Sequence, residues 1–322
     1  MKIIKSLHGI GDHLYERPLI KALAEKETLY VESPLPFMLS GIDNVKFLKT
    51  ETPWRTQNLQ QKIADNNVGI EYSQLPEEAF QQITYPPIRP GYPRPNFNRI
   101  QRVVRPELEI RFGYGPDNYS RWNLIQCLER QAKVTLTEPI DFAMPDFGPC
   151  PVDTGGKKLA IVRPPTDRAE WHTPSRQCLP QYTNRACQML KAVGYYTVSV
   201  ADCVEGKEWL VGDTPEADLI LHSGELSLVK LMALCQHADV IVGGVGWIVP
   251  AGIAFKRNTF ICGGGRAGYD HQEKICDMRM DLEKFTMVHP DFPCMCFEAK
   301  HNCYKIISNF DEEFQKFINN AR

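Results

Sequence analysis

An aspartate beside two glycines, near the start of the chain, is the first group that could carry chemistry. Asp12 follows Gly9 and Gly11, and the next residues have the apolar spacing of three to four that predicts an amphipathic helix. Glycine lets the backbone approach a ligand closely, and the N-terminal end of a helix favours an anion. Asp12 could therefore present a carboxylate to a bound substrate. Alternatively, it only caps the helix, a common role for aspartate.

A second glycine-rich turn lies in the C-terminal half, where the sequence DVIVGGVGWIVPAGIAF predicts a strand, a turn and a helix. Backbone N–H groups of such a turn can hold a pyrophosphate, although packing alone can also demand glycine. The residues expected to contact a phosphate-bearing ligand here are Gly243, Gly244, Val245, Gly246, Trp247 and, at the start of the preceding helix, Ser227.

Basic and aromatic residues follow another predicted strand, KLAIVR, in the same half. A guanidinium group binds phosphate oxygens in a bidentate manner, so this loop could hold a diphosphate. The alternative is an ordinary surface loop. The candidate binding residues are Arg163, Thr166, Arg168 and Trp171.

Cysteines gather near the C-terminal end. Cys294, Cys296, His301 and Cys303 fall within ten positions. Structural zinc takes four ligands of these types. The C-x-C spacing is not the commonest for zinc, and free cysteines are often simply buried. The sequence therefore leaves two hypotheses, a structural zinc ion or four free side chains.

Residues 86–122 are dense in proline, arginine and aromatic residues, with seven arginines against three acids. The prolines disfavour a regular strand or helix in the first half of this segment, which predicts a long loop. Arginine among aromatic residues suits phosphates and stacked bases, so the loop could contact nucleic acid. The alternative is a solvated loop whose arginines pair with surface acids.

Length and composition indicate a soluble protein of two domains. The chain has 322 residues, 43% hydrophobic and 24% charged, with a net charge of −2. This charge argues against a globally basic nucleic-acid binder. No apolar run approaches the roughly 20 residues of a membrane span, and no signal peptide opens the sequence. We therefore expect a cytoplasmic protein whose eleven cysteines are free or metal-bound.

The elements that must position these residues form two similar halves. Each half reads as strand, glycine or basic loop, helix and strand, and the proline- and glycine-rich residues 141–158 form the linker. This order predicts an α/β fold with two Rossmann-like domains and parallel sheets, residues 1–150 and 151–322. Ligands of such sheets bind just past the carboxyl ends of the strands, where both glycine turns lie.

The segment GIGDHLYERPLIKALAE resembles the G-D-x-L-x-x-x-P-L-I-x-A-L opening of the heptosyltransferase-like glycosyltransferases of family 9. The segments LYVES and PFMLSGIDNVKFLK, and the stretch from SLVKLMAL to the second glycine turn, are also similar to that family. The resemblance implies a GT-B fold, in which two Rossmann-like domains face each other across a cleft. It also implies a nucleotide-sugar bound to the second domain, no metal required for catalysis, and a last helix that crosses back to the N-terminal domain.

The same resemblance implies an inverting glycosyltransferase in which Asp12 is the general base. His8 and His13 flank this aspartate and could serve instead, because histidine titrates near neutral pH. The family's usual acceptor is a glycan or a lipid-linked sugar, on the side of the cleft to which residues 86–122 would belong. A modified DNA base is the rival acceptor, motivated by the arginines of that segment.

The sequence departs from the family at the second glycine turn. Gly244 and Val249 stand where the family has an aspartate and a histidine that contact the donor. Three interpretations remain open: a different donor, a donor site made by other residues, or lost catalysis. The alternative function is therefore a catalytically inactive nucleotide- or nucleotide-sugar-binding protein of GT-B fold.

Overall fold

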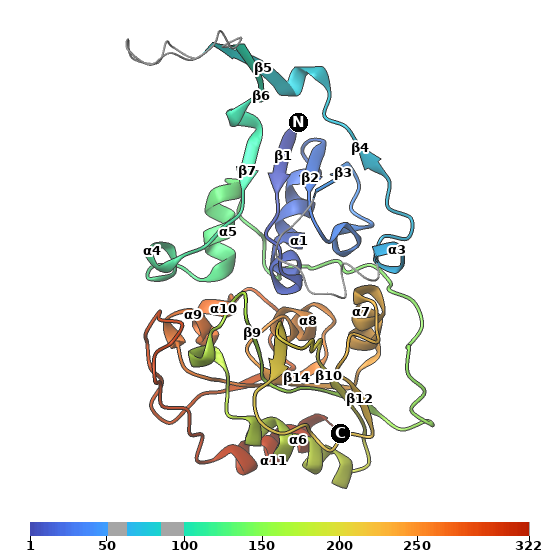
Figure 1. Cartoon of the computed structure of the whole chain (residues 1–322), viewed down its shortest axis with the longest axis vertical. Helices are drawn as coiled ribbons and strands as arrows, with labels where there is room; N and C mark the ends of the chain where they lie inside the picture. Colours follow the sequence, from blue (N-terminus) through green and yellow to red (C-terminus); the bar gives the residue numbers. More distant parts are fainter. Residues whose placement is uncertain (51–62, 85–99, 322) are drawn as a thin grey trace.

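The computed structural model describes residues 1–50, 63–84 and 100–321. Figure 1 shows two α/β halves, one above the other, each built on a parallel sheet. The strands of the first sheet come from residues 2–111 and those of the second from residues 159–288. The predicted α/β fold class with two parallel sheets is therefore confirmed.

The first sheet has the strand order β4-β3-β2-β1-β7. Its strands are β1 (Lys2–Lys5), β2 (Leu29–Glu32), β3 (Val45–Leu48), β4 (Tyr72–Ser73) and β7 (Glu109–Arg111). The helices of this half are α1 (Ile10–Ala24), α3 (Ile63–Asn66), α4 (Pro116–Tyr119) and α5 (Leu124–Ala132). Helix α1 follows the internal strand β1, so its first turn lies at the carboxyl edge of the sheet.

The second sheet has the strand order β12-β10-β8-β13-β14-β15. Its strands are β8 (Leu159–Arg163), β10 (Tyr196–Val200), β12 (Leu219–Leu221), β13 (Val240–Gly244), β14 (Asn258–Cys262) and β15 (Phe285–Val288), and a short antiparallel pair is formed by β9 (Thr166–Arg168) and β11 (Glu208–Leu210). The helices are α6 (Pro180–Ala192), α7 (Leu228–His237), α8 (Ile248–Ala254), α9 (Ala267–Asp270), α10 (Gln272–Ile275) and α11 (Phe310–Ala321). Central residues such as Ile161 and Val242 are fully buried, as expected for a sheet covered on both faces.

The last helix corrects one prediction. Helix α11 does not cross back to the N-terminal domain but packs beneath the second sheet, at the bottom of Figure 1. Phe310, Phe314 and Phe317 surround the ring of Phe260 on β14, with ring centroids 4.9–5.9 Å apart. The amphipathic pattern correctly predicted a helix, and this aromatic cluster explains why its apolar face belongs to the second half.

The described part of the arginine-rich segment also differs from the prediction of one long loop. Residues 86–99 lie outside the described part, but β6 (Ile100–Val104) pairs with β5 (Phe80–Thr84) in an antiparallel arm. Figure 1 shows this arm at the end of the first sheet that is far from the second half, so residues 100–104 do not lie on the acceptor side. Arg102 pairs with Glu77 at 2.8 Å and stacks on Phe80, as in the alternative of arginines paired with surface acids.

A buried arginine holds the linker against the first half. Arg17 of α1 is 1% exposed and donates hydrogen bonds to the carbonyl oxygens of Met38, Ser40, Phe142 and Ala143. Burial lowers the pKa of Arg17 to about 10, so it remains a cation at neutral pH. Arg17 therefore fixes two backbone segments, residues 38–40 and residues 142–143, to α1.

The two halves are joined by direct polar contacts. Arg279 binds Glu129 of α5 at 2.9 Å and Asp277 at 2.8 Å, and Asp277 also accepts a hydrogen bond from Asn123. These contacts lower the pKa of Asp277 to about 2 despite its burial.

Among the described helices, none has both the length and the apolar character needed to cross a membrane.

Candidate functional site

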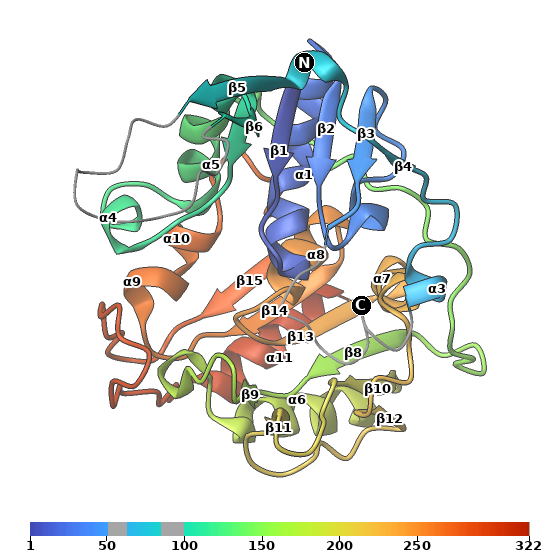
Figure 2. The ribbon, with the colours of Figure 1, turned by 45° about the horizontal axis from the view of Figure 1, so that its top comes forward.

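The two predicted glycine turns meet where the halves face each other. Helix α1 packs against α8, and Figure 2 shows the start of α1 directly above α8. A Cβ atom on Gly11 would lie 3.1 Å from the Cα of Trp247 and 3.7 Å from the Cγ of Pro250. Packing between the halves therefore accounts for the glycine at position 11. It also brings Asp12 to the edge of the second half.

Asp12 lies in the first turn of α1, and both of its oxygens are engaged. Oδ2 accepts the backbone N–H of Gly9 at 3.1 Å, so the capping role is present. Oδ1 accepts the hydroxyl of Tyr114 at 2.8 Å. A Cβ atom on Gly9 would lie 2.6 Å from Oδ2, so the missing side chain leaves room for the carboxylate. The carboxylate is half-buried and has a fixed orientation, as a general base requires.

Two buried polar side chains support this first turn from below. The ring of His13 contacts the carbonyl oxygen of Gly9 through Nδ1 at 2.8 Å and the hydroxyl of Ser33 through Nε2 at 2.7 Å. These contacts give His13 a structural part in holding the turn. Glu16 accepts the N–H of Leu7 at 2.8 Å, and burial raises its pKa to about 8, so this carboxyl group is mainly protonated at neutral pH.

A row of aromatic rings leads from Asp12 into the second half. The rings of Tyr114 and Tyr119 lie 5.2 Å apart, those of Tyr119 and Tyr269 5.1 Å, and those of Tyr269 and Phe297 5.0 Å. Burial and the nearby Asp12 charge raise the pKa of Tyr114 well above its ordinary value. Its hydroxyl therefore remains a hydrogen-bond donor to Asp12 over the physiological pH range.

Arg163, at the end of β8, lies beside the second glycine turn. A Cβ atom on Gly246 would lie 3.5 Å from Nη1 of Arg163, and Nη2 donates to the hydroxyl of Thr166 at 3.2 Å. Burial, together with the charges of Arg168 and Arg176, lowers the pKa of Arg163 to about 10. The guanidinium donates to a hydroxyl and is also within electrostatic reach of Glu208. Its position next to the backbone of the turn suits an anion.

The other residues predicted for the donor have different surroundings. Nε of Arg168 pairs with the buried Glu208 at 2.8 Å, so its charge is already balanced. Trp171 is 53% exposed and can offer an aromatic face to a ligand. Ser227 is buried and caps α7, where its hydroxyl oxygen accepts a backbone N–H of the first helical turn. Its capping contact gives it a structural role.

Tight packing explains the glycines of the second turn. A Cβ atom on Gly243 would lie 2.7 Å from the carbonyl oxygen of Arg163, and one on Gly244 would lie 3.2 Å from Sγ of Cys178. Val249 is 1% exposed within α8. Because this turn carries neither the aspartate nor the histidine of the family, its polar groups are backbone amides and the adjacent Arg163.

Sequence reasoning missed Arg176 and Tyr114. The charge of Arg176 acts on the hydroxyls of both Tyr114 and Tyr119, so Arg176 is within electrostatic reach of the aromatic row that begins at Asp12. Its Nε is buried and lacks a hydrogen-bond partner among the described residues, and the closest atom of Asp270, Oδ1, lies 3.6 Å away. Nothing local marks Arg176 in the sequence except its place after the basic loop that contains Arg168.

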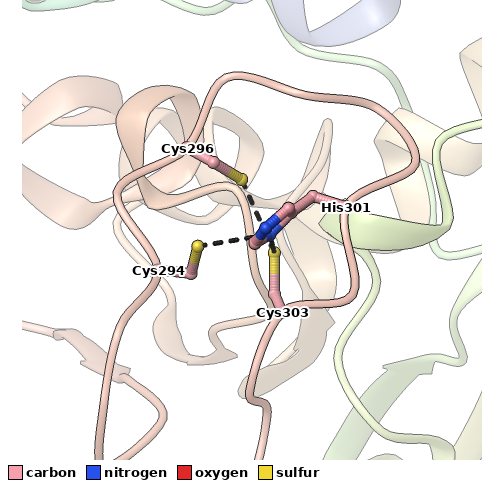
Figure 3. Close-up of side chains that lie close together, drawn as sticks. All are labelled: Cys294, Cys296, His301 and Cys303. Atoms are coloured by element: carbon pink, nitrogen blue, oxygen red, sulfur yellow. Dashed lines mark hydrogen bonds between the residues drawn. The ribbon is translucent and has the colours of Figure 1, made fainter.

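The four C-terminal side chains come together as the metal hypothesis requires. Their ligand atoms all lie within 4.8 Å of one another, and Figure 3 shows the side chains converging from one loop. Nδ1 of His301 is 3.4 Å from Sγ of Cys294 and 3.3 Å from Sγ of Cys303, and the sulfur atoms of Cys296 and Cys303 are 3.6 Å apart. Sulfur ligands around a tetrahedral zinc lie roughly 3.8 Å apart, so the set fits a four-coordinate ion.

A backbone hydrogen bond to one of the sulfur atoms also suits a metal site. The backbone N–H of Arg266 donates to Sγ of Cys303 at 3.4 Å, and such hydrogen bonds hold thiolate ligands in place. The sequence pattern therefore predicted a cluster that could bind an ion. Because the rings of Tyr114, Tyr119, Tyr269 and Phe297 lie between Asp12 and this cluster, an ion there would be structural and not catalytic.

Comparison with solved structures agrees with the fold described above. The iron-containing dodecameric glycosyltransferase TibC of enterotoxigenic E. coli H10407 has a TM-score of 0.59 at 12% identity, over 99% of this chain and 77% of that one. TibC in complex with ADP-D-beta-D-heptose gives 0.55 at 11% identity, over 99% and 75%. A family 9 glycosyltransferase of Veillonella parvula DSM 2008 gives 0.51 at 11% identity, over 99% and 96%.

No protein-family model matches the sequence, and no curated protein matches it either. At 11–12% identity, the similarity to solved structures establishes the fold and leaves the chemistry to the residues of the site. The fold expected from the resemblance is confirmed, because this chain has the GT-B fold of the heptosyltransferase-like glycosyltransferases.

Proposed function

We propose that this protein is an inverting glycosyltransferase that moves a sugar from a nucleotide-sugar to an acceptor hydroxyl. One observation carries the proposal. A carboxylate of fixed orientation, Asp12, lies where α1 meets α8, next to a glycine turn backed by Arg163. A general base on one domain and an anion site on the other are the two parts that such a transfer needs.

The donor diphosphate binds at the second domain in this proposal. Backbone N–H groups of the turn at residues 243–246 and the guanidinium of Arg163 contact its oxygens. Arg176 adds a second positive charge on the side of Asp12. Its side chain is 24% exposed and its Nε faces Asp270 at 3.6 Å, and in this proposal the outer nitrogens of the guanidinium contact a phosphate oxygen. These groups stabilise the diphosphate as it leaves, so the transfer step itself needs no metal.

The acceptor hydroxyl approaches Asp12. Its oxygen attacks the anomeric carbon, the bond from that carbon to the diphosphate breaks with its electron pair, and Asp12 takes the hydroxyl proton. Tyr114 donates a hydrogen bond to Oδ1, which keeps the carboxylate oriented before the proton arrives. Attack from the side opposite the leaving diphosphate inverts the anomeric centre.

The cysteine and histidine cluster belongs to the proposal as a structural metal site. Zinc suits three thiolates and one imidazole, and iron is the second candidate because TibC is described as iron-containing. The ion would link the ends of the loop at residues 294–303. Elemental analysis of the purified protein distinguishes zinc, iron and an empty cluster.

The described arginines favour a glycan or lipid-linked sugar over DNA as the acceptor. Arg102 is paired with Glu77, and Arg111 with Glu109 at 3.0 Å. Arginines that already have acidic partners release fewer counterions from DNA and add less to affinity. Oligonucleotide binding at low salt would reverse this preference.

A second candidate is a nucleotide-binding protein without transferase activity. It is favoured by Gly244 and Val249, which leave the second turn without the acidic and imidazole side chains of the family. Asp12 has no evident purpose in that case beyond capping α1, which favours the enzyme.

The test is a thermal-shift screen of nucleoside-diphosphate sugars, followed by measurement of nucleoside diphosphate release. A ligand that binds only the folded protein raises its melting temperature. ADP-D-beta-D-heptose belongs in the panel because TibC was solved with it. A stabilising sugar nucleotide that the protein also consumes supports the transferase. Stabilisation without release, with and without candidate acceptors, supports the inactive binder, and no stabilisation by any member contradicts both.

A further inference from the structure

Ser175, which precedes Arg176, is bound to the loop of the metal cluster. Its side chain is buried, and its hydroxyl lies 2.7 Å from the carbonyl oxygen of Glu298 and 2.8 Å from that of Ala299. Its backbone N–H donates to the same Ala299 carbonyl at 3.2 Å. Glu298 and Ala299 lie between Cys296 and His301, so this contact is made by the part of the loop that the ligands enclose.

Two more contacts join the cluster to the same region. Nζ of Lys305, two residues after Cys303, donates to the carbonyl oxygen of Pro174 at 2.6 Å. On the other side, Gly265 donates its N–H to the carbonyl oxygen of Ser175 at 2.9 Å. Pro174 and Ser175 are thus held by Lys305 and Gly265, which lie beside Cys303 of the cluster.

The cluster also fixes the ionic partner of Arg176. Arg266 donates its backbone N–H to Sγ of Cys303, and its side chain binds Asp270 at 2.9 Å. Asp270 is the acid that faces Arg176 at 3.6 Å. The backbone before Arg176 and the acid beside it therefore both rest on the cluster.

The loop that carries the ligands has no regular secondary structure. Residues 289–307 contain no helix or strand in the described structure, and backbone hydrogen bonds from Ala267 to Cys294, from Gly268 to Cys296 and from Asp291 to Ile306 hold it at single points. Metal coordination adds a restraint that joins all four ligands, because ion binding is coupled to the order of the chain that carries them.

We infer that a metal ion in the Cys294, Cys296, His301 and Cys303 cluster positions Arg176, and that metal occupancy thereby sets the affinity of the site for a nucleoside diphosphate. The inference rests on the proposed function, since it assigns Arg176 to the donor diphosphate. It makes the cluster a positioning device that acts through Ser175 and Asp270 and does not touch the substrate.

The experiment measures ADP binding by calorimetry on metal-loaded protein, on protein stripped with a chelator and dialysed, and on stripped protein reloaded with zinc or iron(II). Removal of the ion should weaken ADP binding roughly tenfold or more, as expected for loss of a charged hydrogen bond. Reloading should restore the affinity. Circular dichroism of the stripped protein checks that both halves remain folded.

The decisive arm repeats the stripping in Arg176→Met protein. If the cluster acts through Arg176, ADP binds this variant weakly and stripping then changes its affinity by less than about twofold, because coupled effects are not additive. Ser175→Ala should retain its metal and still weaken ADP binding. Cys294→Ser should behave like stripped protein, whereas Cys150→Ser, which removes a thiol outside the cluster, should bind as the wild type does.

Two results would overturn the inference while leaving the proposed function intact. One is equal ADP affinity of loaded and stripped wild type. The other is a loss on stripping that is as large in Arg176→Met as in the wild type. If loaded wild type binds neither ADP nor GDP nor UDP, the proposed diphosphate site is wrong, and the inference falls with it. An absence of metal uptake by the purified or reloaded protein also contradicts it.

Discussion

The two strand-to-helix turns of this protein have the same backbone plan but opposite electrostatic character. The first joins β1 to α1, presents Asp12, and rests on Glu16, a buried acid that is mainly neutral. The second joins β13 to α8, presents backbone amides, and lies against Arg163, a half-buried cation. The fold provides two equivalent positions for a ligand, and the residues beneath each turn decide which chemistry it can perform.

This contrast argues for a division of labour between the halves. An acid that must accept a proton and an arginine that must bind a phosphate would neutralise each other if they formed a direct ion pair. Here Asp12 is bound by an amide and a phenol, while Arg163 donates to the hydroxyl of Thr166. Each group keeps its charge available for a substrate that enters between them.

The largest expected effect comes from removing the cation of the second turn. Arg163→Met should lower the affinity for a nucleoside diphosphate roughly a hundredfold, because a buried charge-assisted contact worth about 2 to 3 kcal/mol is lost. Calorimetry with ADP measures this loss of affinity. Arg185→Met, which removes an exposed arginine paired with Asp311, is the matched control and should bind as the wild type does. Equal losses of affinity in Arg163→Met and Arg185→Met would contradict the proposed role of the second turn.

The next effect concerns stability beneath the first turn. Burial raises the folded-state pKa of Glu16 to about 8, so the folded protein binds a proton there that the unfolded chain releases above its ordinary value of 4.5. The contribution of this group is full below pH 4.5 and is lost as the pH rises towards 8. Glu16→Gln should therefore gain stability over the wild type as the pH rises, by up to about 1.4 kcal/mol per pH unit.

Urea unfolding of wild type and Glu16→Gln at several pH values between 4.5 and 8 measures this difference. A difference that does not change with pH would mean that Glu16 is ionised in the folded protein. Both turns would then lie against a charged side chain, which contradicts the contrast between a neutral Glu16 and a charged Arg163.

The smallest effect sharpens the role of the first turn. Tyr114→Phe removes the hydroxyl that donates to Oδ1 of Asp12, so the carboxylate loses one of the two contacts that fix its orientation. Turnover should fall by roughly threefold to tenfold, while the donor KM changes little. Unchanged turnover would mean that this hydrogen bond does not orient Asp12, and an equal rise in the donor KM would assign Tyr114 to packing.

Local patterns predicted the parts of the site that are local in sequence. The strand, glycine turn and helix around Asp12 lie within a few residues of each other, and so do the four cysteine and histidine ligands. Tyr114 is 102 positions from Asp12, and no local feature connects Arg176 with either turn. Tyr114 reaches Asp12 through the folding of the first half and Arg176 through the packing of the two halves, and a single sequence encodes neither in any short pattern.

The same reason explains the failures in the fold. The apolar face of α11 predicted its existence but could not say which half it covers, because Phe310, Phe314 and Phe317 would suit either sheet. The arginine-rich segment likewise has the composition of a nucleic-acid surface. The structure shows that two of its charges are already balanced, because Arg102 pairs with Glu77 and Arg111 with Glu109.

The most direct test of the account is a paired measurement on Asp12→Asn. Donor affinity is measured by calorimetry and transfer by release of the nucleoside diphosphate, once the thermal-shift screen has supplied a donor. The account predicts donor affinity within about threefold of the wild type and turnover lower by roughly a hundredfold or more, since the amide cannot accept the acceptor's proton. Unchanged turnover would contradict the central claim that the first turn supplies the base and the second holds the diphosphate.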